Sequence, residues 1–346
     1  MSNPITVSTP KQDGFRMPAE WALHERSWMM WPCRSVVWPD MAATRNDFTA
    51  VAHAIREFEP LTMAVNPEDE AEARSMLGSD IEIVVTPLDD SWARDAGPCF
   101  LVDDNGNRAG LNFNFNAWGG KYDPFDSDNA FSGFVLSQTG VPQYHSRLTA
   151  EGGGLSVDGE GTILTTESCF PNNNRNPGWS RAEIENELLD MLGGEKVIWL
   201  PGNVEETETD GHVDGIATFV RPGVVLIENA GDPGDPFHDI MQANIAALEN
   251  QLDAKGRSIE MVSIPEAYDA VTCGDKFCTS YVNSYLVNGG VVMPCYGVAT
   301  DAEAREAFQE IFPDRRIVQV AINNIALGGG GIHCITQQEP KVVQTL

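Results

Sequence analysis

The sequence predicts an α/β fold built from about five copies of one supersecondary unit, assembled either radially or as a solenoid. Segments with helical periodicity alternate with short strand-forming stretches. Most of these strands are followed by a polar or Gly-rich segment and then by two apolar runs around a tight turn. Successive turns lie 53 to 66 residues apart, although the copies share no obvious residue identity.

The helices are predicted by the spacing of apolar residues. Two of the segments begin with a Ser or Thr that is followed three residues later by Glu, the spacing of a capping box. These pairs are Ser180 with Glu183 and Thr300 with Glu303. The predicted helices are 44–58, 180–192, 236–254 and 300–312, with a weaker one at 68–77.

Each helix leads into a β-rich stretch, and four hairpin turns follow along the chain. The predicted strands after helices are 61–65, 81–85, 197–200, 259–264 and 317–322. The turns are Asn105-Gly106, Asp158-Gly159, Pro222-Gly223 and Asn288-Gly289. We expect the strand after each helix to be central and parallel to its equivalents, with an antiparallel hairpin partner. Because no linker divides the chain, we expect residues 1–346 to form a single catalytic domain.

Composition excludes several classes of protein. The 346 residues are 42% hydrophobic, which rules out a disordered chain, and no apolar run approaches the roughly 18 residues of a membrane span. The polar start predicts no signal peptide. The net charge of −29 repels nucleic acid and anionic lipid and attracts cations. It is equally typical of adaptation to salt, so charge alone does not identify a ligand.

The seven cysteines are scattered along the chain, which argues against a disulfide framework. We therefore expect a reducing, cytoplasmic location. Cys273 and Cys278 form the only close pair, and the absence of a second pair argues against a zinc site.

Two segments carry the strongest chemical signals. Cys334 follows four consecutive glycines, which allow unusual backbone angles and close approach of a ligand. It is therefore a candidate nucleophile, although a buried cysteine in a tight loop gives the same pattern. In TDGHVDG, His212 and Asp214 share a face of an extended chain, and Asp210 joins them if the extension continues. This pattern suits acid–base chemistry, a solvated turn or a partial metal site.

Two further segments contribute acids. Asp95 lies in DSWARDAGP beside Trp92 and Arg94, and Glu151 precedes three glycines. Either acid could simply mark a turn. In a radial fold, however, equivalent loops converge at one end of the axis. The site would then combine a thiol, an imidazole and carboxylates, and two carboxylates facing a planar group match a guanidinium.

The motifs GGGGIHCITQQEP, TDGHVDG, DSWARDAGP, EGG, FNAWGGKYD and WMMWP resemble the agmatine deiminase family. This family is also called the Porphyromonas-type peptidylarginine deiminase family, within the guanidino-group-modifying pentein superfamily. The resemblance extends from about Phe15 to Pro340. It implies a five-bladed pseudo-symmetric α/β-propeller (pentein fold) of repeated ββαβ-type units.

The resemblance also implies a role for each polar residue. Cys334 resembles the nucleophile that attacks the guanidinium carbon, and His212 resembles the general acid and base. Asp95 and Asp214 resemble the pair that binds the guanidinium nitrogens, while Glu151 resembles the acid that orients His212. The implied enzyme is a hydrolase of linear amidines with an amidino-cysteine intermediate, no metal and no organic cofactor. An imidazolium near Cys334 is expected to favour its thiolate.

The expected partner is a small cationic guanidino substrate, and the sequence leaves open whether the chain forms a homo-oligomer. Agmatine is favoured because Arg94, the basic residue within the motifs, is expected to point away. Asp210, Trp92 and Trp118 are candidates for binding the amine. The family's usual Asn is replaced by Gly331 in the Cys loop and by Gly215 after the H-x-D motif, which bears on substrate choice.

Three alternatives stay open. The first is a deiminase of peptidylarginine or another guanidino compound. The second is a metal-dependent hydrolase that uses His212, Asp214 and His333, although His333 is expected to point away from the face of Cys334. The third is a non-catalytic protein that binds a guanidine or polyamine.

Overall fold

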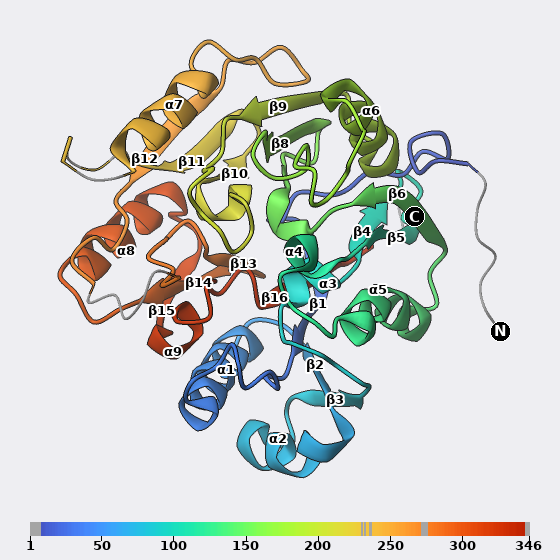
Figure 1. The fold of residues 1–346 in the computed structure, drawn as a ribbon, viewed down its shortest axis with the longest axis vertical. Coiled ribbons are helices and arrows are strands. Elements are labelled where there is room, and N and C mark those ends of the chain that lie inside the picture. Colours follow the sequence, from blue (N-terminus) through green and yellow to red (C-terminus); the bar gives the residue numbers. More distant parts are fainter. Residues whose placement is uncertain (1–7, 230, 232, 235–236, 271–275, 343–346) are drawn as a thin grey trace.

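Five small sheets surround a common centre, and the longer helices lie at the periphery (Figure 1). The computed structural model describes residues 8–229, 231, 233–234, 237–270 and 276–342. The predicted five-bladed pseudo-symmetric α/β-propeller is confirmed, since each sheet forms one blade. None of the helices in these ranges is both long and apolar enough to cross a membrane.

Four blades contain three strands each, in chain order. These are β4 (Cys99–Val102), β5 (Arg108–Asn114) and β6 (Gln143–Thr149); β7 (Ser156–Val157), β8 (Thr162–Thr166) and β9 (Lys196–Leu200); β10 (Ala217–Arg221), β11 (Val224–Glu228) and β12 (Glu260–Ile264); and β13 (Tyr285–Val287), β14 (Gly290–Cys295) and β15 (Arg316–Ala321). In each blade the first two strands form an antiparallel hairpin, and the third is parallel to the second.

The four hairpin turns are confirmed, and the glycine in each has a positive φ between 73° and 76°. The expected strand order is wrong in one respect. In these four blades the second hairpin strand is the middle one, and the strand after the helix is at the edge, whereas the predicted strand 61–65 is interior in its sheet. The first hairpin strand already occupies one side of the second, so the returning strand can pair only with the other side.

The remaining blade joins the two ends of the described chain. β16 (Thr336–Pro340) pairs antiparallel with β1 (His24–Met30), which is followed by β2 (Leu61–Val65) and β3 (Glu82–Val85) in parallel. Met29 lies opposite Thr336, two residues after Cys334. Closure of the ring therefore fixes the position of the Cys334 loop.

The predicted helices differ from the observed ones mainly at their ends. The observed helices are α1 (Met41–Arg56), α2 (Glu70–Leu77), α3 (Ala93–Ala96), α4 (Ala117–Gly120), α5 (Asp126–Thr139), α6 (Arg181–Leu192), α7 (His238–Leu248), α8 (Thr300–Ile311) and α9 (Asn323–Ala326), with short 3₁₀ turns at Pro67–Asp69, Gly152–Gly154 and Val213–Gly215. Helices α3, α4, α5 and α9 were not predicted.

Helix α7 is shorter than predicted, because the chain turns after Leu248 and pairs Leu252 with Ser258. Residue 236, its predicted start, lies outside the described residues. Helix α5 was not predicted, because its apolar and polar residues are poorly separated between its two faces.

The two predicted capping boxes have different outcomes. Ser180 accepts from the backbone N–H of Glu183, and the Glu183 carboxylate accepts from the N–H of Ser180, so this box is confirmed. The box at Thr300 is wrong, because Thr300 is the first helical residue and its hydroxyl binds Asp269.

The fold places one segment of each blade at the centre. α3 precedes β4, the turn Gly152–Gly154 precedes β7, and the turn Val213–Gly215 precedes β10. Residues 280–284 precede β13, and the Cys334 loop precedes β16. The polar segments that recur along the sequence are therefore structurally equivalent.

Candidate active site

Three side chains converge on the backbone of Gly153. A Cβ atom built on Gly153 would lie 2.6 Å from His212 Nδ1, 2.8 Å from Asp95 Oδ1 and 3.1 Å from Asp214 Oδ2. Any residue other than glycine would collide with all three groups. The structure thus brings Asp95, His212 and Asp214 around one small space, although Asp95, Gly153 and the His212–Asp214 pair come from three different blades.

Asp95 is held in helix α3 by two donors. Its Oδ1 accepts from the N–H of Gly153 at 2.9 Å, and its Oδ2 accepts from Trp118 Nε1 at 2.9 Å. Burial raises the pKa of Asp95, and the Asp214 and Glu151 carboxylates raise it further, whereas His212 lowers it. A cationic ligand between these acids would therefore be favoured.

His212 lies between two carboxylates. Its Nε2 is 3.4 Å from Glu151 Oε2, and its Nδ1 is 3.9 Å from Asp95 Oδ1. Although burial favours the neutral ring, the Asp95 carboxylate, with Glu151 and Cys169, raises the pKa of His212 well above its usual range. Within the described ranges Nδ1 makes no hydrogen bond. The imidazolium therefore has a proton that it can give to a ligand.

Glu151 is fixed from behind by Arg175, which the sequence reading missed. Arg175 Nε donates to Glu151 Oε1 at 2.7 Å, and its side chain is fully buried. Burial alone would raise the pKa of Glu151, but the Arg175 guanidinium and His212 hold it below its usual range. Glu151 is thus ionised and able to orient His212.

Asp214 is held by His333, so the expectation that His333 points away is wrong. His333 Nδ1 lies 2.7 Å from Asp214 Oδ2, and His333 Nε2 lies 2.9 Å from Glu20 Oε2. The segment is a turn rather than the extended chain that was assumed. Burial opposes ionisation of Asp214, but His333 holds the pKa of Asp214 below its usual range.

The Cys334 thiol is next to these acids and is 7% exposed. Its Sγ lies 3.6 Å from Asp214 Oδ2 and 3.2 Å from Asn283 Nδ2. Burial, followed by the Asp214 and Asp95 charges, raises the pKa of Cys334 well above its usual range. The expected effect of the imidazolium is therefore outweighed, and the thiol is protonated at neutral pH.

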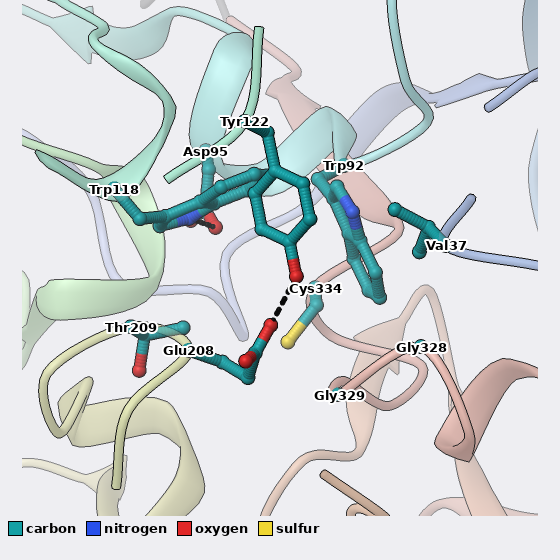
Figure 2. A pocket seen from close by; sticks show the side chains of 10 residues that line it. All are labelled: Val37, Trp92, Asp95, Trp118, Tyr122, Glu208, Thr209, Gly328, Gly329 and Cys334. Atoms are coloured by element: carbon teal, nitrogen blue, oxygen red, sulfur yellow. Dashed lines mark hydrogen bonds between the residues drawn. The ribbon is translucent and has the colours of Figure 1, made fainter. Parts of the chain in front are cut away.

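A cavity of about 340 Å³ leads to this thiol. Figure 2 shows Trp92, Trp118, Tyr122 and Glu208 arranged around Cys334. The other lining residues are Val37, Asp95, Thr209, Gly328 and Gly329. The two indoles predicted to bind substrate thus line the cavity.

The structure does not place Asp210 in the cavity lining. Its Oδ2 accepts from Arg175 Nη1 at 2.6 Å, from Lys121 Nζ at 2.8 Å and from Asn174 Nδ2 at 2.9 Å. The φ of Asp210 is +64°, so the extended geometry assumed for this motif fails there. Glu208, two residues earlier, lines the cavity instead.

The comparison with known protein families decides the identity of the chain. The model of the Porphyromonas-type peptidyl-arginine deiminase family matches residues 16–340. The chain belongs to this family.

Relatives within this deiminase family are similar over nearly their whole length. An agmatine deiminase of Stutzerimonas stutzeri is 43% identical, over 96% of this chain and 98% of its own. An agmatine deiminase of Pseudomonas aeruginosa is 42% identical, over 98% and 99% respectively. The solved agmatine deiminase of Enterococcus faecalis is 38% identical and superposes with a TM-score of 0.95, over 99% of this chain and all of that one.

One group in the deiminase site has metal-ligand chemistry. Ligand atoms of Glu151, Cys169 and His212 all lie within 4.8 Å of one another. The set considered in the metal-hydrolase alternative, His212 with Asp214 and His333, is not arranged in this way. Both ring nitrogens of His333 are bound by carboxylates, and Glu151 also accepts from Arg175.

Proposed function

We propose that this deiminase hydrolyses agmatine to N-carbamoylputrescine and ammonia through an amidino-cysteine intermediate at Cys334. The observation that carries the proposal is the buried pair of carboxylates, Asp95 and Asp214, beside the thiol at the end of a cavity lined by indoles. Relatives named agmatine deiminases that are 42–43% identical support this substrate.

The guanidinium would lie between the carboxylates of Asp95 and Asp214. Both acids border the space in front of Gly153, and Cys334 Sγ lies 3.6 Å from Asp214. Planar N–H donors match this arrangement, and Trp92 and Trp118 add cation–π attraction. Binding of the cation cancels the field that keeps the thiol protonated, so the substrate itself would favour the thiolate.

The far end of the cavity favours an amine over a carboxylate. Glu208 is the partly exposed acid of the lining, and none of the ten lining residues is basic. A terminal ammonium would compete with Lys276 Nζ, which lies 2.8 Å from Glu208, whereas Glu208 would repel the carboxylate of free arginine. This distinction supports agmatine within the guanidino compounds.

The chemistry follows from the protonation states. The thiolate attacks the guanidinium carbon, and His212 gives its proton to the departing amino group, which leaves as ammonia. The resulting amidino-cysteine is attacked by water, and neutral His212 takes the water proton. Collapse of the adduct forms the ureido product and releases the Cys334 thiolate. Asp95 and Asp214 hold the carbon in place throughout.

The decisive experiment measures ammonia release with agmatine, arginine, an arginyl peptide and short guanidino acids. We expect agmatine to be turned over fastest and Cys334→Ser to lose all measurable turnover, because the hydroxyl is far less acidic than a thiol. Acid quenching followed by mass spectrometry should detect the amidino adduct on the Cys334 peptide. Turnover that survives Cys334→Ser, or is removed by a chelator alone, would contradict the proposal.

We also propose that the enzyme works in the reducing cytoplasm. The six cysteines that the structure describes are free thiols, and the mechanism requires Cys334 to be reduced. Cys273, one of the pair examined for zinc, lies outside the described residues.

A further inference from the structure

One of the five equivalent central segments carries no role in the mechanism above. The segments before β4, β7, β10 and β16 supply Asp95, Glu151, His212 with Asp214, and Cys334. The segment before β13 supplies Asn283, whose side chain is 1% exposed and lies at the same centre. Asn283 is thus the uncharged member of a ring of otherwise titratable side chains.

The orientation of the Asn283 amide is fixed by the backbone. Its Oδ1 accepts from the N–H of His333 at 3.0 Å and from the N–H of Cys334 at 3.3 Å. Only the oxygen can accept these bonds, so the amide nitrogen has to point the other way. Nδ2 then lies 3.2 Å from Cys334 Sγ and donates to the carbonyl of Asp214 at 3.3 Å, while the protonated thiol can donate to Oδ1 at 3.4 Å. Once the thiol has lost its proton, Nδ2 is the amide atom that can bind the sulfur anion.

A neutral donor is suited to this place. The carboxylates of Asp95 and Asp214 disfavour a thiolate at Cys334, so a hydrogen bond to sulfur stabilises the reactive form. A lysine or arginine would do the same, but it would also occupy the carboxylates that the substrate needs. An amide stabilises the sulfur anion and leaves those carboxylates free.

Gly331 provides the room for this amide. A Cβ atom at position 331 would lie 2.6 Å from Asn283 Oδ1 and 3.0 Å from Asn283 Cβ. Any side chain there would push the carboxamide away from Cys334. Gly331 and Asn283 therefore act as one unit, and disturbing either should have the same effect on the thiol.

We propose that Asn283 is a positioning residue that orients Cys334 and stabilises its thiolate, in space that Gly331 leaves open. This inference rests on the proposed function in treating Cys334 as the nucleophile. Its test is the reactivity of the thiol itself, which does not depend on the identity of the substrate.

The experiment measures the rate at which iodoacetamide alkylates Cys334, followed on its tryptic peptide from pH 8 to 10 without substrate. The variants are Asn283→Asp, which keeps the shape but replaces the donor by an acceptor, and Asn283→Ala. Because the pKa of Cys334 is already well above its usual range, we expect each variant to lower the thiolate fraction about tenfold or more at every pH in this range. At pH 8 the rate should fall about threefold or more, because a more basic thiolate is partly more reactive.

Gly331→Ala gives a second route to the same defect. We expect it to slow alkylation to a similar extent, and the double variant Gly331→Ala/Asn283→Ala to lose no more than the worse single variant. With agmatine, kcat should fall about 10²-fold while KM changes by less than about threefold. Additive losses in the double variant would overturn the coupling.

Asn66→Asp is the matched control. Asn66 is also buried, and its amide binds the backbone of Leu88; neither residue lines the cavity. It should leave the alkylation profile unchanged, with melting temperature and circular dichroism confirming that each variant is folded. A folded Asn283 variant with the wild-type profile would overturn the proposal. If agmatine is not turned over but the profile shifts, the proposed substrate fails and the role of Asn283 stands.

Discussion

The two ends of the cavity are built in different ways. At the buried end, Asp95 is held by the Gly153 backbone and the Trp118 indole, and Asp214 is held by His333. At the mouth, Glu208 is bound by Tyr122 and by Lys276 Nζ at 2.8 Å, and the Lys276 side chain is half exposed. Long side chains in solvent can exchange partners, whereas buried short ones cannot.

This difference separates two properties of the enzyme. In the proposed mechanism, the reaction depends on groups that the backbone of four blades fixes in place. In the same proposal, recognition of the substrate tail depends on side chains that a single substitution can change without altering the fold. Changes at the buried end should therefore reduce kcat, and changes at the mouth should alter KM and substrate choice.

The largest effect is expected from Asp95→Asn. The variant removes one of the two charges that hold the guanidinium, so kcat/KM for agmatine should fall about 10³-fold or more in steady-state kinetics. Asp47→Asn is the control, since Asp47 is partly buried and binds Asn324 away from the cavity. A loss of less than about tenfold would mean that the carboxylate pair does not hold the reacting group.

Gly153→Ala tests how tightly the buried end is set. The new methyl group would meet His212, Asp95 and Asp214 at 2.6 to 3.1 Å, so we expect kcat to fall about 10²-fold. Gly133→Ala in α5 is the matched control, because a Cβ there meets no atom within 4 Å. Equal activity of the two variants would show that the site tolerates displacement.

Glu208→Gln tests the mouth. Without the carboxylate, we expect KM for agmatine to rise about 10-fold, with kcat changed less than about threefold, because the tail is bound equally in the ground and transition states. Butylguanidine lacks the amine, so its KM should not change. A large fall in kcat with agmatine, or an equal loss with butylguanidine, would contradict the separation of the two ends.

Glu20→Gln should have the smallest effect and one that depends on pH. Burial opposes ionisation of Glu20, yet His333 and Arg94 lower its pKa to about 2, below its ordinary value of 4.5. Its stabilising contribution is therefore complete above about pH 4.5 and lost as the pH falls towards 2. The variant should melt below wild type at pH 6, and the difference should shrink at pH 3. A constant difference would rule out this linkage.

Local features of the sequence predicted much of the fold. Asn105-Gly106 and the other turns mark hairpins because glycine allows the positive φ that each turn adopts, and their spacing reveals the blades. Helix α5 was not predictable in this way, because its apolar residues do not stand out at helical spacing in the sequence. The order of strands within a blade depends on which edge is free, which is not a local property.

The candidate site was predictable only where local sequence motifs mark it. Cys334, His212 and the acids stand in recognisable motifs, and their roles remain predictions. Glu208 was missed because the backbone turns at Asp210, so the alternation of side chains breaks. Arg175 and Glu20 stand in no motif. Arg175 contacts Glu151, which is 24 positions away in the sequence, and Glu20 contacts His333, which is 313 positions away. Such partners become visible only when the blades are assembled.

Pairing of β16 with β1 has a consequence for how activity arises. The nucleophile precedes the strand that joins the two ends of the ring, so four blades could be complete while the thiol is still out of place. Regain of turnover after denaturation should therefore lag behind the recovery of secondary structure and coincide with the final joining step. If turnover returned before the ring had closed, this order of events would be wrong.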